Sequence, residues 1–194
     1  MTLEIRPARR IEGLGLRLRD AGMGDAPLLL SLRTDPVLSR HLSPVDGTLA
    51  QQEAFLHAYQ AGTGQAFFII ETLDGVPWGT VRLYDRRDDS FCWGSWIVRP
   101  GAPARTGTRS ALLSLRHGFE TLGFPACHLD ARQGNERAWR LYEAWGAHLL
   151  RENSSDRFYT LTRDVWDAMV RRYAERFPLD AIRTLPSSYG EDRS

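Results

Sequence analysis

The sequence predicts a domain of mixed α/β (α+β) structure in which a mostly antiparallel sheet is flanked by helices. Three neighbouring segments between residues 65 and 98 are rich in strand-forming residues, with turn residues between them. Beyond residue 100 the apolar residues instead recur every three or four positions, as in helices, with one short strand between two such stretches. With 194 residues the chain is long enough to bury a core of ordinary size.

The overall composition argues against several classes of partner. The 25 basic and 24 acidic residues nearly cancel, so the net charge indicates neither nucleic acid nor an anionic membrane. Every basic residue is an arginine, which we interpret as a compositional bias of the source. Cys92 and Cys127 lack a metal-ligand spacing, so we expect no metal site and no disulfide framework. Because no N-terminal signal core and no run of about 20 apolar residues occurs, we expect a soluble, cytoplasmic protein.

The beginning of the chain predicts a strand followed by a helix. Leu14, Leu16 and Leu18 alternate with polar residues over 13–21, which is typical of a half-buried strand. Apolar residues at helical spacing then predict a helix over 24–33, which Asp35-Pro36 closes.

A second helix is expected after a turn at Ser43-Pro44. Thr48 is a good N-cap residue for a helix over 48–61. The residues expected to face inward are Ala54, Phe55 and Ala58.

The middle of the chain predicts an antiparallel meander. Its three strands are expected over 65–75, 77–85 and 90–98, with turns at Asp74-Gly75 and at 87–89. A loop over 99–109 then leads into a helix over 110–123, and a short strand follows over 126–132. A strand, a helix and a second strand in this order form a crossover unit, so part of the sheet is expected to be parallel.

The last part of the chain is expected to close the sheet. Strands are predicted over 146–153 and 157–166, and a terminal helix over 166–177. We assign residues 1–177 to a single domain. Residues 178–194 show little periodicity, so we expect a C-terminal tail that is mobile or depends on a partner.

A short, well-bounded helix is predicted between Asn135 and Gly146. Asn135 can cap the helix by accepting from N–H groups of its first turn, and Gly146 suits the left-handed C-terminal position. The buried stripe of this helix is expected to consist of Ala138, Leu141, Tyr142 and Trp145.

The loop before the helix over 110–123 is the first feature that indicates chemistry. It contains Gly101, Gly107 and several small residues, and it leads into a helix N-terminus, whose unpaired N–H groups and dipole favour a diphosphate. Arg99, Arg105 and Arg109 would add charge-assisted contacts. An ordinary strand-to-helix connection is the alternative.

The order of elements and two local patterns resemble the Gcn5-related N-acetyltransferase (GNAT) superfamily over residues 14–166. The most specific match is the helix pattern Asn135-x-x-Ala138-x-x-Leu141-Tyr142-x-x-x-Gly146. Residues 96–113 resemble the family's fourth strand, pyrophosphate loop and third helix, and residues 14–33 are similar to the start of the subgroup of ribosomal-protein N-terminal and amino-sugar-nucleotide acetyltransferases. The resemblance implies that the parallel pair of strands is splayed.

The resemblance also implies acetyl-CoA (coenzyme A) as co-substrate, with an amine attacking its thioester directly in a ternary complex. Backbone N–H groups at Ile97 and Val98 are then expected to stabilise the tetrahedral oxyanion. Asn135 is expected to hold the pantetheine arm. The residues expected to hold the pyrophosphate are Arg105, Thr106, Gly107, Thr108, Arg109 and Ser110.

Two proton transfers are required. Tyr142 matches the family's tyrosine and is expected to protonate the leaving thiolate, because a phenol and a thiol have similar reference pKa values. Glu71 is our catalytic candidate for removing the proton of the amine through water, with His128 as the alternative. In the structural alternatives, Tyr142 and His128 are core residues and Glu71 is a solvated strand residue.

One departure from the family pattern concerns the pyrophosphate loop. The family usually has Gln/Arg-x-x-Gly-x-Gly/Ala, whereas this chain has Ala104 at the first position and Arg109 at the last. The Arg109 side chain either crowds the pyrophosphate or turns its guanidinium onto a coenzyme phosphate.

Three functions are compatible with these residues. The favoured one is acetylation of a small amine such as an amino sugar or its nucleotide, and the alternatives are acetylation of a protein N-terminus and a non-catalytic ligand-binding or interaction domain. We expect a small-molecule partner, no nucleic acid, membrane or metal, and leave a homodimer open. Basic and aromatic residues available for a sugar nucleotide are Arg33, Arg40, His41, Trp78, Arg82, Tyr84, Trp93 and Trp96.

Overall fold

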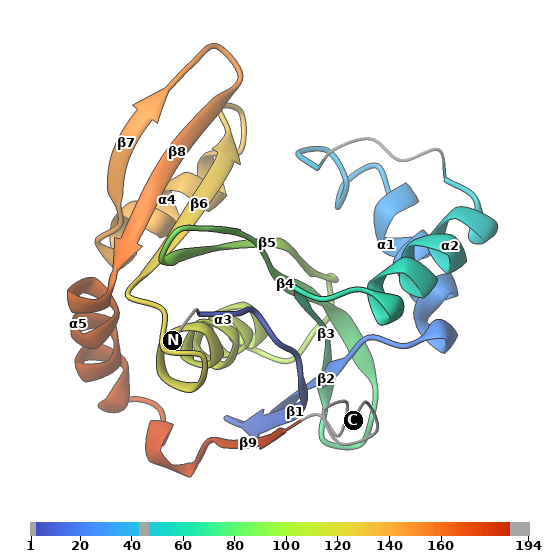
Figure 1. Ribbon diagram of the computed structural model, residues 1–194, viewed down its shortest axis with the longest axis horizontal. Helices are drawn as coiled ribbons and strands as arrows, with labels where there is room; N and C mark the ends of the chain where they lie inside the picture. The colour runs from blue at the N-terminus through green and yellow to red at the C-terminus, as the bar shows by residue number, and fades with distance from the viewer. Residues whose placement is uncertain (1–2, 43–46, 187–194) are drawn as a thin grey trace.

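The protein is built around one sheet, described here from a computed structural model that covers residues 3–42 and 47–186 (Figure 1). Within these residues the sheet has nine strands in the order β7-β8-β6-β5-β4-β3-β2-β1-β9. Every neighbouring pair is antiparallel except β5 and β6, which are parallel. The mostly antiparallel sheet with one parallel pair confirms the predicted fold class. The strands are β1 (Ala8–Gly13), β2 (Leu16–Asp20), β3 (Ala66–Thr72), β4 (Pro77–Arg87), β5 (Ser90–Val98), β6 (Ala126–Arg132), β7 (His148–Glu152), β8 (Asp156–Thr162) and β9 (Arg183–Pro186).

Helices cover both faces of the sheet. Figure 1 shows α1 and α2 together on one side and α3 on the other. Because side chains alternate along a strand, Phe67 and Ile69 of β3 pack with α1 and α2, while Phe68 and Ile70 join the larger core around α3. The helices are α1 (Ala26–Thr34), α2 (Leu49–Ala61), α3 (Thr106–Arg116), α4 (Glu136–Trp145) and α5 (Arg163–Ala174), with short 3-10 turns at Met23–Asp25 and Leu179–Ala181 and a π-helical turn at His117–Thr121.

The first predicted strand is wrong at its start. Leu14 and Gly15 have φ angles of +56° and +73°, so they form a two-residue turn, and β1 pairs with β2 on either side of it. The alternation of Leu14 with Leu16 and Leu18 continues across this turn. The segment was therefore predicted as one strand. β1 was not predicted.

The second helix has the predicted cap but a different buried face. The Oγ1 of Thr48 accepts from the backbone N–H of Gln51 at 3.3 Å. Leu56 and Tyr59 are buried, whereas Ala54 and Ala58, predicted to face inward, are exposed. Burial of the larger side chains removes more apolar surface from water, so they decide which face packs on the sheet. The predicted turn at Ser43-Pro44 lies outside the described residues.

Two helices begin earlier than predicted. α3 starts at Thr106 instead of residue 110, because the Thr106 hydroxyl donates to the carbonyl of Pro103 at 2.7 Å and Arg105, with φ +64°, turns the chain into the helix. α5 starts at Arg163 instead of residue 166. The glycine and threonines of 106–109 are weak helix formers, but tertiary packing overrides that preference.

The part of the chain predicted to be a C-terminal tail, 178–194, contains the 3-10 turn at Leu179–Ala181, where Leu179 is buried, and the strand β9. β9 pairs with β1 in antiparallel fashion and forms an edge of the sheet. Residues 187–194 lie outside the described residues, and the division at residue 177 stays a prediction. In the part of the chain that the structure describes, no helix is long and apolar enough to cross a membrane.

Candidate functional site

The site is an opening between β5 and β6, the two parallel strands. Their pairing covers only residues 90–92 of β5 and 126–128 of β6. β5 then continues beside β4 to Val98, while β6 continues beside β8 to Arg132, so the strands diverge. We call the space between 93–98 and 129–132 the β5–β6 opening. Backbone groups of β5 that face it have no strand partner, and such groups need another donor or acceptor.

The backbone of β5 presents one amide of the predicted pair to this opening. The N–H of Arg99 donates to the carbonyl of Trp78 at 2.8 Å, and the carbonyl of Ile97 lies against Gly79, where a Cβ would come within 1.9 Å of it. Ile97 and Arg99 therefore direct their backbone groups toward β4. Because direction alternates along a strand, the amide of Val98 faces the β5–β6 opening.

A β-bulge lies in the middle of β5. Ser95 has a φ of +48°, the β4–β5 register shifts at this point, and the Thr80 hydroxyl donates to the Ser95 carbonyl at 2.9 Å. After the bulge, Ser95 and Ile97 face the side of α1 and α2, while Trp96 faces α3. The bulge thus shifts the alternation of side chains by one residue, so that both Trp93 and Trp96 face α3 while Ile97 faces the side of α1 and α2.

The start of α3 offers backbone groups more than side chains. Ser110 is fully buried and its hydroxyl accepts from Trp96 Nε1 at 3.1 Å, and the Thr106 hydroxyl is bonded to Pro103. A Cβ at Gly107 would lie 3.2 Å from the Trp96 ring, so packing alone explains this glycine. The Thr106 amide already donates to the Pro103 carbonyl at 3.1 Å, so the amides of Gly107 and Thr108, for which α3 itself offers no acceptor, are the ones suited to an anion.

The arginines at this helix start lie near the surface. Arg105 is exposed, and Thr108 and Arg109 are half-buried. The Nη1 of Arg109 lies 3.7 Å from the position that a Cβ on Gly15 would occupy, so the side chain extends toward the β1–β2 turn.

Helix α4 confirms the predicted boundaries. The Oδ1 of Asn135 accepts from the N–H of Ala138 at 3.4 Å, and Gly146 has a φ of +94°. Tyr142 is buried, with its ring edge-on to Trp93 and Tyr159.

The hydroxyl of Tyr142 has no hydrogen-bond partner among residues 3–42 and 47–186. Tyr142 therefore does not fit the structural alternative, in which the hydroxyl of a core tyrosine is hydrogen-bonded within the protein. Burial raises the pKa of the phenol well above its usual value, so Tyr142 carries its proton at neutral pH.

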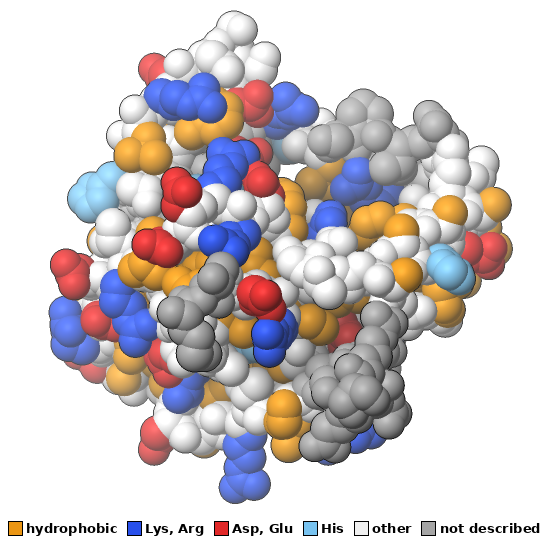
Figure 2. All heavy atoms as spheres, in the orientation of Figure 1, with side chains coloured by type: hydrophobic (Ala, Val, Ile, Leu, Met, Phe, Trp, Pro, Cys, Tyr) orange, Lys and Arg blue, Asp and Glu red, His pale blue; other side chains and the backbone are white. Residues whose placement is uncertain are grey.

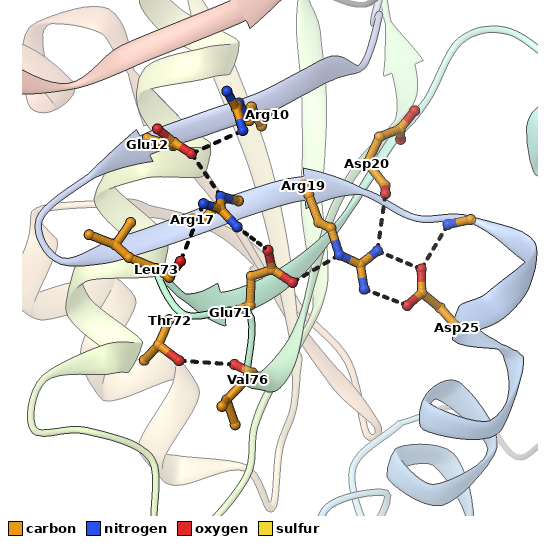
Figure 3. Close-up of polar contacts among 11 residues, drawn as sticks. Arg10, Glu12, Arg17, Arg19, Asp20, Asp25, Glu71, Thr72, Leu73 and Val76 are labelled. Carbon is orange, nitrogen blue, oxygen red and sulfur yellow. Dashed lines mark hydrogen bonds and ion pairs between the residues drawn. The ribbon is translucent and has the colours of Figure 1, made fainter.

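Glu71 lies in a network of ion pairs. Its carboxylate accepts from Arg17 Nη1 at 3.0 Å and from Arg19 Nε at 2.9 Å, and only 4% of the residue is exposed (Figure 3). Arg19 also makes a two-pronged contact with Asp25 at 2.6 and 2.8 Å. The catalytic role of Glu71 stays a prediction, but both of its oxygens are held by arginines, an environment that favours a structural role.

His128 lies where β5 and β6 begin to diverge. Its Nδ1 is 2.8 Å from the Ser90 hydroxyl, while its Nε2 is buried and has no hydrogen-bond partner among the described residues. Burial and the charge of Arg87 lower the pKa of this imidazole, so it is neutral at pH 7 and can accept a proton. The nearest carboxylate is that of Asp85, at 3.7 Å. In the same described part of the chain, no group of three His, Cys, Asp or Glu residues could hold a metal ion.

A cavity of about 340 Å³ lies between α1, α2 and the sheet. Figure 2 shows arginine and apolar side chains at the hollow between the α1–α2 side and the opposite strands. The cavity reaches the Ile97 side chain, so it is continuous with the bulged part of β5. Its apolar lining residues are Leu29, Leu32, Phe55, Phe67 and Ile97.

The polar lining of the cavity contains two members of the predicted basic and aromatic set, Arg33 and Arg82. Trp93 and Trp96 of the same set instead lie on the α3 side of β5. Sequence reasoning missed the pairing of Arg17 and Arg19 with Glu71. The sequence feature that could have indicated this pairing is two arginines on the polar side of β2 followed by a single glutamate in β3. The register between the two strands, however, was not predictable from the sequence.

Asp20, the last residue of β2, has a carboxyl group whose pKa is raised. It accepts from the Tyr59 hydroxyl, and burial raises its pKa from 3.8 to about 6. The folded state therefore binds this proton more tightly than the unfolded state. The protonated Asp20 therefore stabilises the folded state. This contribution to the free energy of unfolding is complete below about pH 4 and is lost as the pH rises through about 6.

Asp20→Asn is expected to flatten this pH dependence, because the amide can still accept from Tyr59 but does not ionise. Between about pH 4 and 8, the free energy of unfolding of the wild type should fall by about 1–2 kcal/mol more than that of the variant, allowing for solvent screening. Urea denaturation across this range measures it. Parallel curves for the two proteins would contradict the assignment to Asp20.

Comparison with known proteins adds the family context. A model of the acetyltransferase (GNAT) domain family matches residues 15–148. No curated protein sequence matches the chain. Among solved structures, "Apo FdhC, a nucleotide-linked sugar GNAT" is 28% identical with a TM-score of 0.73, covering 90% of this chain and 98% of that one.

Two further structures share the fold at lower identity. A GCN5-related N-acetyltransferase from Brucella melitensis is 18% identical with a TM-score of 0.73, covering 90% of this chain and 88% of that one. A spermidine N-acetyltransferase from Vibrio cholerae, in complex with CoA and spermine, is 17% identical with a TM-score of 0.69, covering 78% of this chain and 98% of that one.

Proposed function

Because the chain belongs to the GNAT acetyltransferase family, we propose that it moves an acetyl group from acetyl-CoA to the primary amine of a small molecule, with an amino sugar or its nucleotide as the favoured acceptor. The observation that carries this proposal is the β5–β6 opening, with the amide of Val98 facing it and the start of α3 beside it. A cavity of about 340 Å³ favours a small acceptor over a protein N-terminus.

In the proposed reaction the amine nitrogen attacks the thioester carbon, and the carbon–sulfur bond then breaks. The oxyanion formed in between accepts from the Val98 amide. Tyr142 donates its phenolic proton to the departing thiolate, for which its unpartnered hydroxyl and retained proton are suited. No covalent bond to the protein is needed.

The proton of the amine must leave before or during the attack. His128 suits this step better than Glu71, because its Nε2 makes no hydrogen bond among the described residues and the imidazole is neutral, whereas Glu71 is held by two arginines. We propose that water carries the proton from the amine to His128.

The coenzyme would lie along the β5–β6 opening. The amides of the first turn of α3, with Arg105 and Arg109, suit the pyrophosphate, and Asn135 suits the pantetheine arm. Both the helix start and the asparagine flank the opening, since α3 follows β5 and α4 follows β6 in the chain.

Calorimetric titration with acetyl-CoA tests this site. Arg109→Ala should weaken binding by about 1–3 kcal/mol, the scale of a charged hydrogen bond. The same change at Arg86, an exposed residue of β4 outside the site, should leave the affinity unchanged. Absence of binding at millimolar acetyl-CoA would contradict the proposal, and tighter binding by Arg109→Ala would show that this side chain crowds the coenzyme.

A further inference from the structure

Two polar side chains that line the cavity beside Ile97 have hydrogen-bonding capacity that the protein does not use. One is Gln52 on α2 and the other is Ser95 at the bulge of β5, so they belong to opposite walls of the cavity. Neither side chain makes a hydrogen bond with any other of residues 3–42 and 47–186. The cavity therefore presents a primary amide and a hydroxyl group to a molecule that enters it.

Gln52 lies on the inward face of α2. It shares this face, at helical spacing, with Leu56 and Tyr59, which pack against β3. Only 7% of Gln52 is exposed, and the residue lines the cavity, so its amide opens on this space. A buried amide without a protein partner is satisfied only by water or by a ligand. Its position thus indicates a hydrogen bond to the contents of the cavity.

Ser95 has a backbone conformation that favours glycine. Its φ of +48° lies in the left-handed region, which strains any residue that carries a Cβ, and the left-handed position of a bulge is usually taken by glycine. Among the described residues, the others with a Cβ and a positive φ all lie outside the cavity; they are Leu14, Asp85, Asp88 and Arg105. A serine at a strained position in a cavity indicates a use for its hydroxyl.

The surroundings of Ser95 hold it beside the expected reaction centre. The Thr80 hydroxyl, in a residue only 2% exposed, donates to the Ser95 carbonyl at 2.9 Å. Because a strand rises about 3.3 Å per residue, Ser95 lies no more than about 10 Å from the Val98 amide, which faces the β5–β6 opening. An acceptor bound to Ser95 can therefore place its amine at the thioester.

The amide and the hydroxyl together select a group that both donates and accepts. Each of them offers a donor and an acceptor, so a ligand that displaces water from both must supply both kinds of hydrogen bond. An alcohol does so, whereas an ammonium group only donates and a carboxylate only accepts. The apolar wall residues, Leu29, Leu32 and Phe55 among them, suit the carbon skeleton of such an alcohol.

We propose that Gln52 and Ser95, the hydroxyl-binding pair, bind hydroxyl groups of the acceptor, so that the protein acts on primary amines with a hydroxylated carbon skeleton in preference to plain alkyl or cycloalkyl amines. This inference rests on the proposed function and assigns the recognition of its acceptor to two residues. The pair holds the acceptor between α2 and β5, with the amine toward Val98.

A binding experiment tests the hydroxyl-binding pair without turnover. In the ¹⁵N-labelled protein, the side-chain amide signals of Gln52, identified by their loss in Gln52→Leu, should shift on titration with glucosamine or galactosamine and not with cyclohexylamine. Leucine has a similar size and no polar atoms, so Gln52→Leu should melt at the same temperature as the wild type or higher.

Substitutions of Ser95 separate its hydroxyl from its strained backbone. Ser95→Ala and Ser95→Gly both remove the hydroxyl, and each should lower kcat/KM for the amino sugar by about 3- to 10-fold, the scale of one hydrogen bond. Glycine also relieves the strain, so Ser95→Gly should melt no lower than the wild type. Asp88→Gly is the matched control, because Asp88 has the same φ of +48° outside the cavity, and it should leave kcat/KM unchanged.

An activity experiment tests the preference with matched amines. Glucosamine and galactosamine carry an amine beside hydroxyl groups on a six-membered ring, and cyclohexylamine carries an amine on such a ring without hydroxyl groups. We expect kcat/KM for at least one of the amino sugars to exceed that for cyclohexylamine by about 10- to 100-fold. In the double variant Gln52→Leu/Ser95→Ala, this preference should fall to about 3-fold or less.

The outcomes separate this inference from the proposed function. Equal kcat/KM for cyclohexylamine and the amino sugars, or a preference that survives the double variant, would overturn the hydroxyl-binding pair and leave the acetyltransferase intact. A shift of the Gln52 signals with an amino sugar, in a protein that acetylates no amine, would support the pair and contradict the proposed function. Absence of any shift with both amino sugars would overturn the pair, and a lower melting temperature of Ser95→Gly would make Ser95 a structural residue.

Discussion

Tyr142→Phe is expected to lower kcat by roughly 10²–10⁴-fold, the usual scale for loss of a general acid. Phenylalanine keeps the ring that packs edge-on against Trp93 and Tyr159, so the core around α4 stays intact. Because the hydroxyl has no hydrogen-bond partner among the described residues, its removal leaves no protein group unpaired. Coenzyme affinity and melting temperature should therefore change little, and steady-state kinetics with calorimetry measure both.

A neighbouring tyrosine provides the matched control. Tyr159 is also buried and contacts the Tyr142 ring, but its hydroxyl donates to Glu143 at 2.9 Å. Tyr159→Phe should reduce stability slightly and leave kcat unchanged. An unchanged kcat in Tyr142→Phe, where chemistry limits the rate, would assign the proton transfer to water or to another residue. A large loss of stability in that variant would make Tyr142 a structural residue.

Glu71→Gln is expected to lower the free energy of unfolding by about 2–4 kcal/mol. The change removes the charge between Arg17 and Arg19, which hold the carboxylate at 3.0 and 2.9 Å. It leaves two cations close together beside a buried amide that can accept from only one of them well. Partial exposure of the arginines places the loss somewhat below that of a fully buried pair. Urea denaturation measures it.

Glu12 gives the control for this network. It also pairs with Arg17, at 2.7 Å, but about a third of its side chain is exposed. Glu12→Gln should therefore cost less than about 1 kcal/mol. The turnover of folded Glu71→Gln should stay close to that of the wild type. If kcat falls by about 10²-fold or more while stability is unchanged, Glu71 is the base that the sequence indicated.

Local signals in the sequence predicted much of this fold. The cap at Asn135 and the glycine at 146 bound α4 as expected, because both positions act through backbone geometry within a few residues. The meander β3–β5 and the parallel pair β5–β6 followed from the order of elements. The hairpin at Leu14 and Gly15 was missed, since alternation by itself does not reveal where a strand reverses.

The site shows where sequence reasoning ends. The residues of the opening were found because they lie in one continuous segment, from β5 into α3. The partners of Glu71 and the direction of the Ile97 and Val98 amides depend on strand register and on the bulge at Ser95, which are set by pairing between distant segments. The cavity lined by Arg33 and Arg82 likewise exists only after α1 and α2 cover the sheet.

Mass spectrometry of a single-turnover reaction tests the central claim most directly. Protein in excess over acetyl-CoA is mixed with glucosamine or galactosamine, and the protein and the amine are both followed with time. The account predicts one acetyl group on the nitrogen of the amine and no acetylated protein at any time, because the amine attacks the thioester itself. Accumulation of an acetylated protein before product forms, or no acetylated amine from either compound, would contradict it.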